Sequence, residues 1–434
     1  MFLEHVEIEN CKSLIHAEID FRTAEDAIRK WSILVGENGT GKSTVLKAIG
    51  LLLAGSDSIP HIIGDPALWV RKGAASCSLK ASLRTKSGEK REVSLSFQPE
   101  HQTREILSLN ADSLEAIDSA LSYAEQNYFV AAYGPYRRIA DTASSFASPT
   151  PSLGGTGAVG ERVGSLITMF DKNAPVNPLP GWAMDLEYER GDEGLKIVRD
   201  AMDALLPNLQ FKRIDRTAKR LIFETADGEV PLEELSDGYQ NVAAWIGDLL
   251  HRVTRAFAHY TNPLEARGLL LIDEVDAHLH PTWQRRLRMY LDSRLPNFQI
   301  IGTTHSALTL QQFHEGEAFV LGRDVQKRVG LAPFATDPSK LRLHQLYDLA
   351  FKISSFESVE VEESKSTVAK LRDKVQLDAS EEAALATARD VLDSASDQQT
   401  AADDALGNEV LENLFGRLDK LASDIETKTG HAGS

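Results

Sequence analysis

The stretch Gly36 to Ser43 constrains this chain more than any other, because it reads Gly-Glu-Asn-Gly-Thr-Gly-Lys-Ser and matches the pattern G-x-x-x-x-G-K-S. An apolar run, Trp31 to Val35, lies directly before it, and the residues from Thr44 to Leu53 continue with the apolar spacing of a helix. Strand, glycine-rich loop and helix in that order are the context of a phosphate-binding loop. The stretch therefore predicts an α/β fold that presents this loop at the end of a strand.

Each residue type in this phosphate loop has a physical role in holding a polyphosphate. The glycines let the backbone curl so that several N–H groups point inward, and the following helix adds the positive end of its dipole. The lysine would reach the β- and γ-phosphates of ATP, and the serine hydroxyl would ligate Mg²⁺. We expect the nucleotide to contact nine consecutive residues, namely Gly36, Glu37, Asn38, Gly39, Thr40, Gly41, Lys42, Ser43 and Thr44.

A second motif supplies acidic groups at another strand end. The run Leu269 to Ile272 is entirely apolar, as in a buried parallel strand, and Asp273 and Glu274 follow it directly. An apolar strand that ends in Asp-Glu is common by itself, but here a phosphate loop lies upstream. We therefore expect Asp273 to hold Mg²⁺ and Glu274 to polarise the attacking water as a general base.

A third motif, Leu235 to Gln240, opens the long apolar helical pattern from Asn241 to His259. A serine and a glycine at a helix N-terminus, here Ser236 and Gly238, can form an anion site. The alternative is an ordinary helix cap, provided by Ser236 or by the aspartate that follows it.

Composition limits the class of protein. The chain has 434 residues, of which 42% are hydrophobic and 26% charged, as in soluble globular proteins of two to four units. Cys11 and Cys77 lack metal-site spacing, so we expect small buried groups in a reducing compartment. The charged N-terminus is unlike a signal peptide and no run of about 18 apolar residues occurs, which predicts a cytoplasmic protein without a membrane span. A net charge of −17 argues against coating nucleic acid, although a local basic groove stays open.

Hydrophobic patterning divides the chain into four predicted parts. Residues 1–100 form a nucleotide-binding lobe, in which the alternating stretches Cys77 to Leu83 and Glu92 to Phe97 predict a hairpin and so an antiparallel β layer. Residues 101–215 are expected to be a mostly helical insertion. Its stretch 141–164, rich in Ser, Gly, Pro and Thr, predicts a mobile loop.

The other two parts follow the insertion. Residues 216–344 alternate strands and helices, as a doubly wound α/β lobe does. Residues 345–434 are expected to form an acidic helical C-terminal region, because 357–434 alone contain 18 acidic against 8 basic residues, a net of −10. One helical pattern there places Val410, Leu411, Leu414, Leu418 and Leu421 along one side. That stripe favours a docking or oligomerisation helix, and a solvated appendix without a partner is the alternative.

Taken together, these motifs resemble those of ABC-class ATPases of the RecF, SMC-like and OLD type. More narrowly, they resemble the stand-alone AAA-family ATPases of bacterial defence loci, such as the Septu and PARIS ATPase subunits. The resemblance covers residues 1–55 and 230–325 well. It rests on the phosphate loop, Ile8 to Leu14, Leu235 to Gln240, Asp273 to Pro281, Thr304 to Ser306 and Tyr133 to Arg137.

The resemblance implies roles for further residues. Leu235 to Gln240 takes the place of the ABC signature motif, so Ser236 and Gly238 would bind the γ-phosphate held by another copy of the chain. Asp276 matches the D-loop that crosses the dimer interface, and His305 matches the switch histidine that senses the γ-phosphate. The expected assembly is a head-to-tail homodimer, or a higher homo-oligomer, around ATP and Mg²⁺. The expected fold is an ABC-type ATPase head.

The resemblance has limits as well. The signature motif lacks Gly-Gly-Gln, and no clear Q-loop glutamine is present, since Gln126 is poorly placed. No TOPRIM or HNH pattern follows His305, so a nuclease activity would belong to a separately encoded effector. We expect an ATPase that regulates such an effector in anti-phage defence. The alternatives are a RecF-like, ATP-gated DNA-binding protein of repair and, with less support, a transporter ATPase subunit.

Two smaller groups leave alternatives open. Arg137 and Arg138 follow a strand and a Gly-Pro turn, where they could meet nucleotide or nucleic acid or form a solvated basic pair. His278 and His280 suggest a metal site at first sight, but no other ligands stand at a suitable spacing. We expect neither histidine to bind a metal.

Overall fold

The structure is a computed structural model in which the chain divides into two compact units, Met1–Lys352 and Ile353–Ser434. It describes residues 1–85, 88–124, 128–137, 158–176, 179–205, 209–226, 228–258, 260, 263–353, 355–372, 374 and 378–395.

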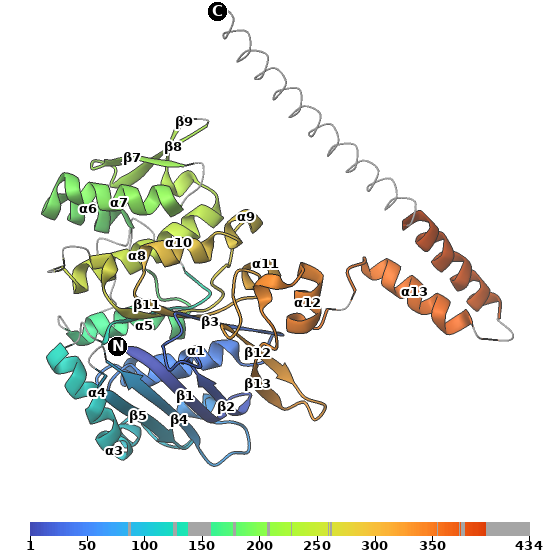
Figure 1. Ribbon diagram of the computed structural model, residues 1–434, viewed down its shortest axis with the longest axis horizontal. Helices are drawn as coiled ribbons and strands as arrows, with labels where there is room; N and C mark the ends of the chain where they lie inside the picture. Colours follow the sequence, from blue (N-terminus) through green and yellow to red (C-terminus); the bar gives the residue numbers. More distant parts are fainter. Residues whose placement is uncertain are drawn as a thin grey trace, which may run out of the picture. The chain divides into compact units, whose positions relative to one another are not determined.

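A ten-stranded sheet runs through the first unit (Figure 1). In spatial order its strands are β5 (Lys90–Phe97), β4 (Cys77–Arg84), β1 (Phe2–Cys11), β2 (Leu14–Asp20), β13 (Val329–Pro333), β12 (Ala318–Arg323), β3 (Trp31–Gly36), β11 (Phe298–Thr303), β10 (Gly268–Ile272) and β6 (Val130–Tyr133). A separate antiparallel sheet contains β7 (Gln210–Asp215), β8 (Arg220–Thr225) and β9 (Gly228–Pro231).

The large sheet joins a parallel part to an antiparallel part. Strands β12, β3, β11, β10 and β6 are parallel neighbours, whereas β5, β4, β1 and β2 are antiparallel. Strand β13 connects the two parts, since it runs antiparallel to β12 and meets β2 at Val329 and Leu14. The predicted α/β class is confirmed. The antiparallel β layer is a continuation of the parallel sheet, because the β13 connection lets backbone hydrogen bonds run across both parts.

Side chains of the parallel strands alternate between two hydrophobic cores, one on each face of the sheet. In β10, Leu269 and Leu271 belong to the core around α1, whereas Leu270 and Ile272 belong to the core around α8. This alternation follows from the period of two residues along a strand. Because both faces are covered, β10 has the all-apolar sequence of a buried parallel strand.

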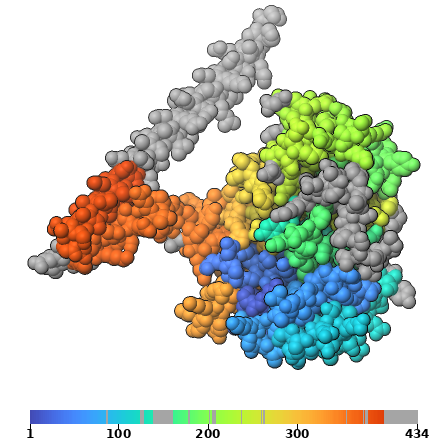
Figure 2. Space-filling view, turned by 180° about the vertical axis from the view of Figure 1, so that it is seen from behind, coloured from blue at the N-terminus to red at the C-terminus, as the bar shows by residue number. Residues whose placement is uncertain are grey.

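Helices cover both faces of the sheet, with α8 and α10 on the side opposite α1 (Figure 1). Figure 2 shows, from behind, β1, β2, β4, β5, α3 and α4 at one end of the first unit and the α6 to β9 region at the other. The α-helices that the structure describes in this unit are α1 (Lys42–Leu52), α2 (Ile59–Ile62), α3 (Thr103–Leu109), α4 (Ala111–Ala124), α5 (Ala158–Phe170), α6 (Leu179–Arg190), α7 (Asp192–Leu205), α8 (Asp237–Ala256), α9 (Pro281–Gln284), α10 (Leu287–Arg294), α11 (Ala307–Leu310) and α12 (Leu343–Phe351).

Residues 158–164, which the sequence predicts as part of a mobile loop, differ from that prediction. Helix α5 begins at Ala158, so residues 158–164 of the predicted mobile loop are helical. The buried side chain of Arg162 explains this difference, because it donates hydrogen bonds to the backbone carbonyls of Leu53 and Tyr128, outside the helix, once α5 packs in the first unit. The earlier part of that loop, 141–157, lies outside the described residues.

The second unit contains α13 (Val359–Arg372) and a helix at 379–395. The predicted helix with the stripe from Val410 to Leu421 lies outside the described residues. Within the part of the chain that the structure describes, no helix is long and apolar enough to cross a membrane.

Candidate nucleotide-binding site

Four neighbouring parallel strands end at the same edge of the sheet, and each is followed by residues that could act on a nucleotide. Strand β3 leads into the phosphate loop, and β10 leads into Asp273 and Glu274. Strand β11 is followed by Thr304 and His305, and β6 by the turn that begins at Gly134. Because parallel strands share one carboxyl edge, residues from 36 to 305 are brought to one site.

The phosphate loop has the curled backbone that its sequence predicts. Gly36, Gly39 and Gly41 have φ values of 137°, 73° and 96°, in the region that favours glycine. A Cβ atom at Gly36 would lie 2.0 Å from the carbonyl oxygen of Leu321, so no side chain fits there. Gly41 is the N-cap of α1 and provides no side-chain cap. The first turn of α1 therefore keeps backbone N–H groups for an anion.

Lys42 lies within the curl of this loop. Its Nζ atom donates hydrogen bonds to the carbonyl oxygens of Gly36, at 2.8 Å, and Glu37, at 2.9 Å. Burial lowers the pKa of the Lys42 ammonium, and the carboxylates of Asp273 and Glu274 oppose that shift. The lysine is thus preorganised over the loop, with two acidic groups as its electrostatic neighbours.

Thr303, at the end of β11, orients both acidic residues. Its Oγ1 donates to Oδ1 of Asp273 at 2.6 Å and accepts a hydrogen bond from the backbone N–H of Glu274 at 2.7 Å. Asp273 and Thr303 are buried. Glu274 is half-buried and has a φ of 49°, unusual for a residue with a side chain. Our sequence reasoning did not assign a role to Thr303, although it comes directly before Thr304 and His305.

His305 lies in the same electrostatic environment. Partial burial lowers the pKa of its imidazole first, and the positive charge of Lys42 lowers it further, against the raising effect of Glu274 and other carboxylates. The side chain is nevertheless exposed. A neutral imidazole that is open to solvent and close to Lys42 suits contact with a bound phosphate.

Asp276 is held inside the chain. Its Oδ2 accepts hydrogen bonds from Oγ1 of Thr304 and Oγ1 of Thr309, both at 2.7 Å, and its side chain is buried. These contacts fix the turn after β10 to the start of α11. The predicted role of Asp276 at a nucleotide across a dimer interface stays a prediction.

The signature motif lines a pocket of about 520 Å³ with residues of the turn that follows Asp276. Ser236 is the N-cap of α8 but makes no capping hydrogen bond with its side chain. A Cβ atom at Gly238 would lie 2.8 Å from the carbonyl oxygen of His278, so the glycine allows close approach. The lining residues are Ser236, Gly238, Tyr239, Val242, His278, Leu279, His280 and Trp283, all from outside the phosphate loop.

Arg137 is buried, so it is not part of a solvated basic pair, which was one of the two predicted alternatives for this residue. Its guanidinium hydrogen bonds to backbone carbonyls of Gly134, Asp273 and Glu274. The sequence motif Tyr133 to Arg137 indicated that this segment is functional, but it did not predict the hydrogen bonds from Arg137 to Asp273 and Glu274. Arg138 and Gln126 lie outside the described residues.

The residues fit ATP and Mg²⁺. The loop backbone and Lys42 suit a polyphosphate, and the Ser43 hydroxyl and the Asp273 carboxylate are oxygen ligands of the kind Mg²⁺ prefers. His280 caps α9, because its Nδ1 accepts a hydrogen bond from Thr282 N–H.

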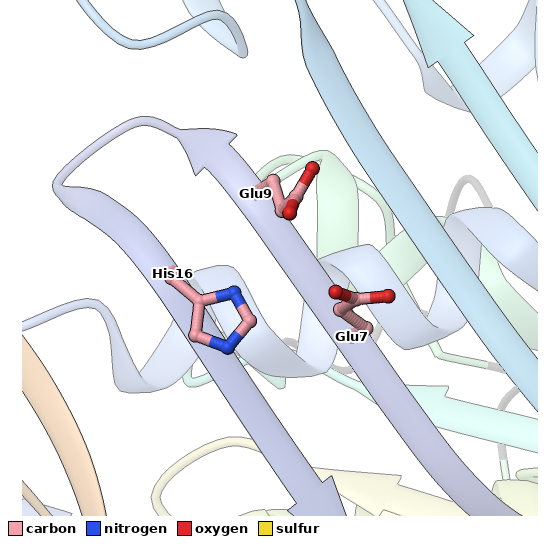
Figure 3. A group of neighbouring side chains, drawn as sticks. All are labelled: Glu7, Glu9 and His16. Atoms are coloured by element: carbon pink, nitrogen blue, oxygen red, sulfur yellow. The ribbon is translucent and has the colours of Figure 1, made fainter.

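Within the described part of the chain, the side chains that could together ligate another metal are Glu7, Glu9 and His16 (Figure 3). Glu9 lies opposite His16 in the β1–β2 ladder. Glu7 already accepts a hydrogen bond from Lys80 at 3.0 Å, which neutralises one of the two carboxylates. Lys80 thus competes with a metal, and Ser43 and Asp273 remain the predicted Mg²⁺ ligands.

The parallel sheet, the glycine loop and the acidic strand end define the class of a phosphate-loop ATPase domain. The family model described as "AAA domain, putative AbiEii toxin, Type IV TA system" matches residues 78–311, and one described as "AAA ATPase domain" matches residues 1–129. Since the first match spans more than half of the chain, the chain belongs to this AAA domain family.

Several curated proteins are similar to parts of this chain. The chain is 29% identical over 321 residues to the Septu protein PtuA of Bacillus mycoides (strain KBAB4), covering 74% of this chain and 40% of that protein. It is 35% identical over 119 residues to the Retron Ec83 probable ATPase of Escherichia coli, covering 27% and 22%. A Retron Vc95 probable ATPase of Vibrio cholerae serotype O1 biovar El Tor is 32% identical over 152 residues, covering 35% and 28%. The chain thus spans less than half the length of these relatives.

Two of the solved structures that the chain matches are SMC head domains. An SMC head bound to the C-winged helix domain of ScpA has a TM-score of 0.45 and 12% identity, covering 77% of this chain and 98% of that one. The SMC head domain from Thermotoga maritima has a TM-score of 0.39 and 14% identity, covering 77% and 99%.

Proposed function

We propose that the chain binds and hydrolyses ATP with Mg²⁺ at the carboxyl edge of its parallel sheet. The observation that carries this proposal is the meeting of Lys42, Asp273, Glu274 and His305 at that edge, where the pKa of Lys42 and that of His305 each respond to the two carboxylates. Lys42 and the backbone of the loop bind the β- and γ-phosphates.

The acidic residues and the histidine have separate proposed roles in metal binding, activation of water and contact with the γ-phosphate. Asp273, oriented by Thr303, would hold the metal ion, which would supply positive charge against the phosphates. Glu274 takes or orients the proton of the attacking water. His305, kept neutral by burial and by Lys42, contacts the γ-phosphate.

A second part of the proposal is a head-to-tail dimer. The signature residues Ser236 and Gly238 line a pocket with the turn after Asp276, and that pocket contains none of the phosphate-loop residues among its described lining. The phosphate loop and the signature residues are thus separate within one chain. In a head-to-tail dimer, the signature residues of a second copy would complete the nucleotide site. The Ser236 hydroxyl, which does not cap its helix, is available for that contact.

A third part concerns the biological role. The chain resembles a Septu protein and retron ATPases over the ATPase region, and we propose that it regulates a separate effector, a nuclease, in anti-phage defence. These relatives favour that role over a RecF-like repair protein. Co-purification from the native operon, with measurement of the mass of the complex, tests it. A complex without a nuclease contradicts the effector proposal and leaves the ATPase proposal standing.

The ATPase proposal is tested with two variants. Lys42→Ala should abolish ATP binding in calorimetry, because the variant lacks the point charge for the phosphates. Glu274→Gln should keep ATP bound but slow hydrolysis by about 10²–10⁴-fold, the usual contribution of a general base. Unchanged ATP affinity in the first variant, or unchanged turnover in the second, contradicts the assigned role.

The same variants test the dimer. Glu274→Gln with ATP should increase in mass by light scattering, because a trapped nucleotide holds two copies together, and Lys42→Ala should stay at the mass of the nucleotide-free chain. A mass that ATP leaves unchanged in the Glu274→Gln protein argues against the dimer.

A further inference from the structure

Arg137 connects three elements that meet at the catalytic edge. Its Nε donates to the carbonyl oxygen of Gly134 at 3.1 Å, which fixes the turn after β6. Its Nη2 donates to the carbonyl oxygens of Asp273 and Glu274, the second at 2.7 Å. Its Cζ lies 5.4 Å from the ring centroid of Trp245, which belongs to α8.

The surroundings make these contacts strong. Arg137 is only 3% exposed, and hydrogen bonds and cation–π contacts gain strength when water is excluded. Burial lowers the pKa of Arg137 to about 10, while the carboxylates of Asp273 and Asp276 oppose that shift. The guanidinium therefore remains charged at neutral pH.

The hydrogen bond from Arg137 to the carbonyl of Glu274 stabilises an unusual backbone conformation. The φ of Glu274 is 49°, a conformation that residues with a side chain rarely adopt. Thr303 holds the N–H of Glu274 and Arg137 holds its carbonyl, so the two ends of the residue are fixed from different elements. The direction of the Glu274 side chain follows from that backbone.

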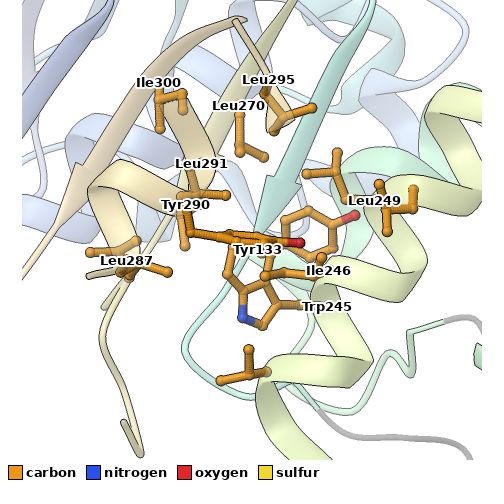
Figure 4. Packing of buried hydrophobic residues seen from close by; sticks show 14 of the residues in the cluster. Tyr133, Trp245, Ile246, Leu249, Leu270, Leu287, Tyr290, Leu291, Leu295 and Ile300 are labelled. Atoms are coloured by element: carbon orange, nitrogen blue, oxygen red, sulfur yellow. The ribbon is translucent and has the colours of Figure 1, made fainter. Parts of the chain in front are cut away.

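The other end of the connection is the helix that carries the signature motif. Trp245 and Tyr133 lie next to each other in the core between α8 and the sheet (Figure 4), with ring centroids 5.8 Å apart. The Tyr133 hydroxyl donates to Oδ2 of Asp248 on α8 at 2.6 Å. The segment from Tyr133 to Arg137 thus binds both α8 and the turn that bears Glu274.

We propose that Arg137 is a positioning residue that holds Glu274 in its catalytic orientation and couples it to α8. A displacement of α8 at the signature motif is then transmitted to the general base through Trp245 and Arg137. This inference rests on the proposed ATP hydrolysis. In the described contacts, Arg137 touches neither the phosphate loop nor Lys42. We therefore expect it to affect the rate of ATP turnover and not the affinity for the nucleotide.

The test compares two buried arginines in the full chain. Arg162 serves as the matched control, because it is also buried and also donates to backbone carbonyls, those of Leu53 and Tyr128. Arg137→Met keeps an apolar side chain against Trp245 but removes the donors. We expect its kcat to fall about 10²-fold, the effect of a misplaced catalytic group, with ATP affinity unchanged. Arg162→Met should lose thermal stability and keep its kcat.

Arg137→Lys provides a variant that keeps the charge and a donor. We expect it to recover part of the lost kcat, because an ammonium can still bond the carbonyl of Asp273 or Glu274 but lacks the planar fork. If Arg137→Met does not fold, this variant decides: a reduced kcat with unchanged ATP affinity supports the inference. A wild-type kcat in Arg137→Met, or in Arg137→Lys where Arg137→Met does not fold, overturns the inference, and so does an equal fall in Arg162→Met.

A double-variant cycle tests the coupling to α8. Trp245→Leu should lower kcat, and its effect should be less than additive with that of Arg137→Met, because both changes interrupt one contact. Fully additive effects overturn the coupling. An inactive wild-type chain would defeat the proposed ATPase function itself, whereas an active wild type with unaffected Arg137 variants defeats only this inference.

Discussion

Replacement of Thr303 by valine should separate the orientation of the acidic residues from the stability of the fold. Valine has nearly the shape of threonine but lacks its hydroxyl. The variant therefore loses the hydrogen bond to Oδ1 of Asp273, at 2.6 Å, and leaves the N–H of Glu274 without the acceptor 2.7 Å away. Thr303 is fully buried, so water does not replace either bond.

The size of the effect follows from these two contacts. A hydrogen bond to a charged group contributes about 1.5–3 kcal/mol and a buried orphaned donor costs about 1–3 kcal/mol, so the unfolding free energy should fall by about 2.5–6 kcal/mol. The kcat for ATP should fall about 10²-fold, since the metal ligand and the general base both lose their orientation.

Thr254→Val is the matched control. Thr254 is also buried, accepts a hydrogen bond from Trp182 Nε1 at 3.0 Å and donates to the carbonyl of Leu250 at 2.8 Å. It should lose stability and keep its kcat. Denaturant unfolding and steady-state ATPase assays measure both quantities. The reasoning is refuted if folded Thr303→Val retains the kcat of the wild type, or if Thr254→Val loses as much activity.

Three further predictions follow from particular residues. Gly238→Ala should weaken ATP-dependent assembly, measured by light scattering, because the new Cβ would lie 2.8 Å from the carbonyl oxygen of His278; unchanged assembly would show that this approach is not needed. The pKa of His305 is lowered from 6.5, so as pH falls through 6.5 the unfolded chain takes up a proton that the folded chain does not. The wild type should therefore lose more stability than His305→Gln over that range in denaturant unfolding, and parallel losses would contradict the shift. Truncation after Phe351, next to the boundary of the first unit, should leave ATP binding intact in calorimetry and weaken assembly or effector capture. Unfolding of the shortened chain, or assembly like that of the full chain, would show that the C-terminal region is structural.

Local patterns in the sequence were sufficient to predict several strands of the large sheet. The apolar run from Leu269 to Ile272 predicted β10, which begins one residue earlier, at Gly268. The alternating stretches Cys77 to Leu83 and Glu92 to Phe97 predicted the paired strands β4 and β5. Both features depend on neighbours within a few residues, which is the range over which periodicity acts.

The sequence by itself also determined which chemical groups the candidate site is predicted to contain, since the order of its motifs indicates the loop, the acidic residues and the histidine. Only the tertiary structure decided how these groups are held. Arg137 lies 136 residues from Asp273, and Thr303 lies 30 residues from it. Whether a polar side chain is buried and bonded depends on partners that the fold brings together, and no local pattern contains that information. The roles of Thr303 and Arg137 therefore emerge only once β6, β10 and β11 lie side by side.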